Sequence, residues 1–233
     1  MMHRALFACA EPRETKWQLS ELLPSGAGDI VLFGWNIGAQ IDDGIPAEVG
    51  ALIAKALTSV ARVTFQRDEA ARLNSTEWST EDGDLVRTLP DPNQSKFAQL
   101  VLKRAPSGIN MVSTQRSETA AALFDVGQWP WWQQGQFVLL SAPDAAPPSI
   151  SRDTLISIFH GEWNEHLTEL REMGVVGVLR PGVDGDVFAV LFLTRRFRDA
   201  LLQSLAQYAK QAGYAWSLLS EEEFTEASSR PLA

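Results

Sequence analysis

The sequence predicts an α+β (mixed α/β) fold. Apolar residues recur at helical spacing in several segments, and short apolar runs bounded by glycine or proline predict strands between them. Of the 233 residues, 45% are hydrophobic and 21% are charged, which is the composition of a folded globular chain. We expect two subdomains divided near Pro147: residues 1–146 with a βαβ-like opening, and residues 147–233 in the order α-β-β-α-β-α with an antiparallel hairpin.

A strand, a loop and a helix open the predicted N-terminal subdomain. Residues 29–35 form an apolar run after a glycine-containing turn, which predicts a strand. Pro46 then precedes a segment whose apolar residues share one helical face, because proline is favoured at the start of a helix. Residues 63–65 predict the next strand, and together these elements make a βαβ-like unit.

The loop between this first strand and its helix is a candidate ligand site. If the sheet is parallel, the loop 36–43 lies at the carboxyl end of the strand, where open α/β sheets bind ligands. Its polar residues Asn36, Asp42 and Asp43 are the candidate ligand-binding residues. Turn formation explains the aspartates equally, since they are adjacent to a glycine.

The middle of the chain predicts short elements separated by a turn-rich stretch. The sequence from Glu81 to Asp84 is the clearest turn, because aspartate and glycine are favoured in turns. We expect strands near residues 85–89, 109–113 and 137–141, and helices at 95–104 and 118–124, the last with Ser117 as its cap.

Three tryptophans stand close together at Trp129, Trp131 and Trp132, around Pro130. Three indoles left in water would make a patch of roughly 450–750 Å², at or above the largest that a typical monomer exposes. The cluster is therefore either part of the core or a surface that binds a partner, and both alternatives stay open.

The C-terminal elements have stronger signals. Residues 151–173 predict a helix that Gly161 kinks or splits, and the almost wholly apolar run 187–194 predicts a central strand. The remaining expectations are a strand at 175–180, a helix at 197–212 ended by Gly213, a strand at 214–219, and a capping box of Ser220 and Glu223 before a terminal helix.

Arg195, Arg196 and Arg198 begin the penultimate helix, and Arg180 lies on the neighbouring hairpin arm. Cations oppose the helix dipole at an amino terminus, so acidic groups should compensate them. These are either the chain's own carboxylates, Asp199 among them, or an anionic ligand, so the three helix arginines are candidate anion-binding residues.

Charge and cysteine content exclude several classes of function. The net charge of −9 repels phosphate backbones and anionic lipids, so we expect neither a nucleic-acid nor a membrane partner. Cys9 is the single cysteine, which is typical of a reducing compartment and excludes a cysteine-rich metal site. Glu162, His166 and Glu169 share a helix face, but a solvated helix edge explains that spacing, and no metal or cofactor is expected.

No phosphate loop, dinucleotide fingerprint, nucleophile elbow or zinc helix is present in the sequence. The leading expectation is therefore a non-catalytic cytoplasmic protein that binds another protein, of inhibitor, immunity or adaptor type. The alternative is a small-ligand-binding protein or enzyme of α/β type that uses the loop Asn36–Asp43. The sequence leaves the oligomeric state open.

Overall fold

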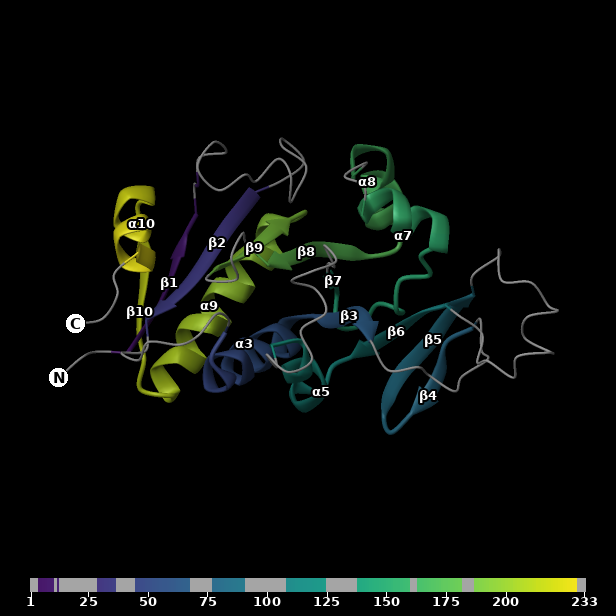
Figure 1. The fold of residues 1–233 in the computed structure, drawn as a ribbon, viewed down its shortest axis with the longest axis horizontal. Helices are drawn as coiled ribbons and strands as arrows, with labels where there is room; N and C mark the ends of the chain where they lie inside the picture. The colour runs from purple at the N-terminus through teal and green to yellow at the C-terminus, as the bar shows by residue number, and fades with distance from the viewer. Residues whose placement is uncertain are drawn as a thin grey trace.

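The computed structural model describes residues 4–10, 12, 29–36, 45–67, 77–90, 108–124, 138–159, 163–181 and 187–229. Within these ranges ten strands form one sheet in the order β10-β1-β2-β9-β8-β7-β3-β6-β5-β4 (Figure 1). All neighbouring strands are antiparallel except β1 and β10, which run parallel. The strands are β1 (Ala5–Cys9), β2 (Asp29–Asn36), β3 (Arg62–Arg67), β4 (Ser79–Glu81), β5 (Asp84–Pro90), β6 (Gly108–Thr114), β7 (Val138–Ser141), β8 (Val175–Pro181), β9 (Val187–Phe192) and β10 (Ala215–Leu219).

Helices cover both faces of this sheet, so the fold belongs to the mixed α+β class (Figure 1). One face packs against α3 (Ala47–Val60), α5 (Ser117–Ala121) with the 3₁₀ turn η1 (Ala122–Phe124), and α9 (Arg195–Gln211). The other face packs against α7 (Arg152–Phe159), α8 (Trp163–Glu172) and α10 (Glu221–Ser229). Because a β-strand points successive side chains to opposite faces, each strand supplies both cores in turn.

Most of the predicted C-terminal elements are confirmed. Strand β9 lies between β2 and β8 with all six residues buried, as its continuous apolar run predicted. The predicted helix at 151–173 is two helices, α7 and α8, on either side of residues 160–162, where Gly161 stands. Helix α9 ends before Gly213, which adopts a φ of 80°, and Ser220 and Glu223 make the expected reciprocal capping bonds.

The βαβ-like opening differs from the expected arrangement. Strands β2 and β3 run in the same direction, but β9, β8 and β7 lie between them, and both neighbours of β2 are antiparallel to it. The crossover through α3 therefore spans strands supplied by later parts of the chain, and strands from both sides of Pro147 share one sheet. The boundary near Pro147 stays a prediction.

Two local assignments also need correction. Ser117 is the first residue of α5 and Arg116 is its N-cap, without a side-chain capping bond. Strand β1, for which the sequence gives no alternating pattern, is a buried strand between β2 and β10. The helix predicted at 95–104 falls outside the described residues and stays a prediction.

The sheet has two outer edges, β10 and β4, at opposite ends of the long axis (Figure 1). None of the helices in the described ranges is both long and apolar enough to cross a membrane.

Candidate functional site

The predicted ligand loop is only partly within the described residues. Asn36 is the last residue of β2, half-buried, and pairs with Ala5 of β1. Asp42 and Asp43 lie outside the described residues. Strand β2 has antiparallel neighbours on both sides, so the rule that places ligands at the carboxyl ends of parallel strands does not apply to the loop that follows it.

The tryptophan cluster of Trp129, Trp131 and Trp132 also lies outside the described residues. Phe124, shortly before it, is buried in the core formed with α3, and β7 begins shortly after it. Whether the cluster is core or partner surface therefore stays a prediction.

The arginines at the start of α9 have different environments. Arg198 makes an ion pair of 2.6 Å with Asp29 at the start of β2 and another of 3.2 Å with Asp199. Arg195 and Arg196 are exposed. The backbone N–H of Phe197 donates to the Thr194 hydroxyl, which caps the helix. Arg198 thus has counterions within the chain, while an anion-binding role for Arg195 and Arg196 stays a prediction.

Arg180 is separate from this group. It lies on β8 opposite Ala189, and it is 6% exposed. Its neighbour Leu179 belongs to the core beneath α3 and α9, so the alternation of side chains places Arg180 on the face that carries α7, α8 and α10. Burial lowers the pKa of the Arg180 guanidinium to about 10, because an apolar environment disfavours the charged form.

Among the described residues, no three histidine, cysteine or acidic side chains are grouped as metal ligands. His166 and Glu169 approach within 3.2 Å on α8, and Glu162 lies outside the described residues. This pair is the ordinary i, i+3 contact of a helix surface.

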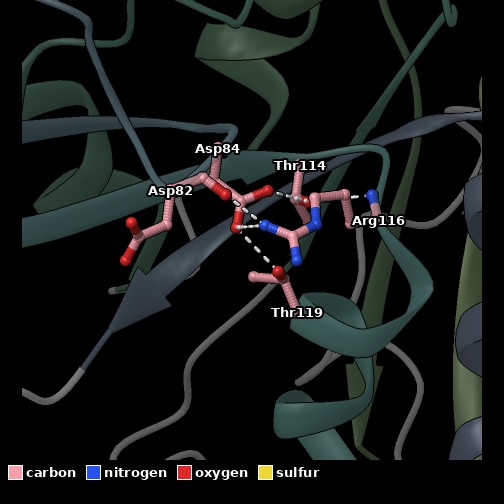
Figure 2. A network of polar contacts seen from close by, with 5 residues as sticks. All are labelled: Asp82, Asp84, Thr114, Arg116 and Thr119. Carbon is pink, nitrogen blue, oxygen red and sulfur yellow. Dashed lines mark hydrogen bonds and ion pairs between the residues drawn. The ribbon is translucent and has the colours of Figure 1, made fainter.

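A polar network joins the β4–β5 hairpin to α5 (Figure 2). Asp84, which is 8% exposed, accepts hydrogen bonds from the hydroxyls of Thr114 at 2.5 Å and Thr119 at 2.6 Å. Arg116 donates to the carbonyl of Asp82 and lies 3.9 Å from the Asp84 carboxylate. The Asp84 carboxylate is occupied by these donors, so the network holds the β4–β5 hairpin, β6 and α5 together.

An apolar recess lies between the sheet and α9, lined by Leu6, Phe33, Trp35 and Trp216 among others. Its interior volume is about 10 Å³, which is close to the minimum that admits one water molecule. It has no room for an organic ligand.

The β10 edge is the feature most suited to contact with another molecule. Among the described strands, β10 pairs only with β1, and none of its five residues is charged. Leu218 is 57% exposed, and it is the large hydrophobic side chain that stands out as exposed among the described residues. Exposed, uncharged edge strands are templates for pairing with another chain.

Sequence reasoning predicted the strand at 214–219 but not that it is an edge. The signal was its content: Ala215–Leu219 contains a tryptophan and two leucines without a lysine or proline, and natural edges usually carry such protecting residues. Comparison with models of known protein families gives no match. No curated protein and no solved structure matches the chain either.

Proposed function

We propose that this chain is a non-catalytic protein that binds another protein, of inhibitor, immunity or adaptor type, through the β10 edge. The observation that carries the proposal is the exposed Leu218 on an outer strand that contains no charged residue and no proline. We also propose that the protein acts in the cytoplasm, since its single cysteine, Cys9, is a buried free thiol.

The opposite edge of the sheet provides the comparison. Strand β4 has three residues, ends in the exposed Glu81, and has no exposed large hydrophobic side chain. Shortness and charge are the features by which natural sheets avoid unwanted pairing. The two edges of the sheet therefore differ in length, charge and exposed hydrophobic surface. These features favour the addition of a second chain at β10 and disfavour it at β4.

The charge of the chain supports a protein partner over other polymers. A net charge of −9 repels nucleic acids and anionic membranes. Sheet extension also requires only backbone groups and a few side-chain contacts, so it needs no catalytic residues.

Affinity capture from the native host tests this function with three forms of the full-length protein. The parent, the edge variant Leu218→Lys and the opposite-edge control Thr80→Lys are compared, with melting temperatures to establish that each is folded. We expect one partner protein to co-purify with the parent and with Thr80→Lys and to be lost from Leu218→Lys. Equal recovery of a partner by all three forms, or by none, would show that the β10 edge does not bind a protein.

A further inference from the structure

The two faces beside the β10 edge differ in chemistry, and this difference specifies a partner. Resting on the function proposed above, we propose that the partner contributes an extended segment with alternating apolar and basic side chains, which joins the sheet as a strand next to β10.

The backbone of β10 offers hydrogen-bonding groups to such a strand. The Ala215 N–H donates to the carbonyl of Arg4 at 2.9 Å, so the Ala215 backbone faces β1. Successive residues of a strand direct their N–H and C=O groups to opposite sides, so those of Trp216 and Leu218 face outward. An added strand can pair with both residues, each of which supplies one donor and one acceptor.

The face that carries α9 is apolar at this edge. The pairing of β1 and β10 places Trp216 opposite Leu6 and Leu218 opposite Ala8, and all except Leu218 belong to or pack against the core beneath α3 and α9. Leu218 continues this apolar row outward. Side chains of directly opposite residues on neighbouring strands lie close together. An apolar residue of the partner strand opposite Leu218 would therefore cover it.

The opposite face carries an acidic helix. Phe224 anchors α10 by an edge-to-face contact with Phe7, their ring centroids 5.3 Å apart, and α10 lies over β2 and β1 and reaches β10. From Gly213 to Ser229 the chain has four glutamates and no lysine or arginine. An added strand directs every second side chain toward this face, and basic side chains at those positions complement the charge.

A second copy of this chain fits the edge less well. Antiparallel pairing of two β10 strands would be related by a two-fold axis perpendicular to the sheet, which keeps each helix on its own face. Both α10 helices would then flank the same junction with their glutamates. Like charges brought together at an interface are unfavourable, so a heterologous basic segment is favoured over self-association.

Selection from a library of random peptides tests the chemistry of the segment. Peptides of about twelve residues, long enough to span an ordinary strand with flanks, are displayed on phage and selected against the immobilised full-length protein. We expect the enriched peptides to carry lysine or arginine at alternate positions with apolar residues between them.

Fluorescence anisotropy of one enriched peptide then compares the variants. We expect Leu218→Lys to weaken binding about tenfold or more, because it places a cation on the apolar row. The double variant Glu222→Gln/Glu226→Gln should weaken it roughly three- to tenfold at low salt and hardly at high salt, as exposed charge pairs do. Thr80→Lys should bind the labelled peptide like the parent. The unlabelled peptide should displace the labelled one, whereas a scrambled peptide of the same composition should not.

The inference would be overturned if the enriched peptides were acidic, lacked the alternation or shared no consensus. It would also be overturned if the double glutamine variant bound the peptide as tightly as the parent at low salt. If a host protein is nevertheless captured through Leu218, the proposed function survives and only the chemistry of the segment is wrong. A concentration-dependent dimer that Leu218→Lys abolishes, measured by light scattering, would assign the edge to a second copy and overturn the inference.

Discussion

The hydroxyl of Thr119 donates a hydrogen bond of 2.6 Å to the carboxylate of Asp84, across 35 positions of the chain. Thr119 lies in the first turn of α5, and Asp84 is the first residue of β5, directly after the hairpin turn. Helix α5 has only five residues and lacks a side-chain cap of its own. A carboxylate near a helix amino terminus is favoured by the helix dipole, so Asp84 adds to the negative charge of Glu118 in the first turn of α5.

The first prediction concerns this contact. Asp84→Asn should lower the free energy of unfolding by about 1–3 kcal/mol, because the buried hydroxyl of Thr114 and the half-buried hydroxyl of Thr119 lose part of their shared acceptor. Thr119→Val should lower it by about 1–2 kcal/mol, and the double variant should cost less than the sum of the two. Urea denaturation measures all three.

Asp82→Asn is the matched control for this network. In Figure 2 the Asp82 carboxylate points away from Asp84, and only the main-chain carbonyl of Asp82 takes part in the network. Asparagine tolerates the positive φ of 50° at this position. We expect a change within about 0.5 kcal/mol; a loss as large as that of Asp84→Asn would mean that general charge, not the buried contact, stabilises the hairpin.

Gly50 provides a second prediction, in which packing opposes helix propensity. Alanine in place of a helical glycine usually stabilises a protein by about 0.5–1 kcal/mol. A Cβ at Gly50 would stand 2.5 Å from the Cβ of Phe124, an atom that no side-chain rotation can move away. Overpacking of this kind costs about 1–3 kcal/mol, so Gly50→Ala should lower the melting temperature.

Thr58→Ala in the same helix is the control for Gly50→Ala. The Thr58 hydroxyl bonds back to the carbonyl of Ala54 at 2.8 Å, so its removal leaves no tertiary partner unsatisfied. Alanine should then raise stability by about a few tenths of a kcal/mol through helix propensity. A higher melting temperature for both Gly50→Ala and Thr58→Ala would show that α3 and η1 can move apart at no cost in stability.

The prediction of elements succeeded where the signal is local. Helix α9 followed from apolar residues at helical spacing, with Gly213 at its end, and α10 followed from the Ser220–Glu223 box. Strand β1 was not predicted, because five apolar residues without alternation resemble many other short apolar runs.

The order of strands had no local signal. The insertion of β9, β8 and β7 between β2 and β3 depends on which apolar faces pack together over long distances in sequence. The same holds for the β10 edge: the sequence predicted the strand, but whether a strand has one neighbour or two is decided by the whole sheet. Arg198 pairs with Asp199, as expected, but it also pairs with Asp29, which stands 169 positions away and had no local signal.

The third prediction concerns this ion pair. Asp29 is 37% exposed and Arg198 28% exposed, so solvent screens their attraction. Arg198→Gln and Asp29→Asn should each lower the free energy of unfolding by about 0.5–1 kcal/mol, with a coupling of a few tenths between them. High salt should reduce the loss of stability that each substitution causes, because it screens the ion pair.

Arg195→Gln/Arg196→Gln is the companion variant, because both side chains are exposed. We expect a change of about 0–1 kcal/mol, and no anion-specific stabilisation of the parent in thermal-shift measurements with phosphate or sulfate at constant ionic strength. Saturable stabilisation by one anion that this variant loses would instead make the arginines a ligand site.

The last prediction concerns the pH response of α10. The Ser220 N–H and hydroxyl donate to the Glu223 carboxylate at 2.9 and 2.8 Å, and these bonds, the backbone one first, lower the pKa of Glu223 below its ordinary 4.5. A carboxylate whose pKa is lower in the folded state stabilises that state above its unfolded pKa, and this contribution is lost as pH falls through the folded pKa. An NMR titration should therefore place the Glu223 midpoint below that of a peptide of residues 217–226. Ser220→Ala keeps the backbone donor, so its midpoint should rise only part of the way; a midpoint equal to that of the peptide in the parent protein would show that the capping box does not form in solution.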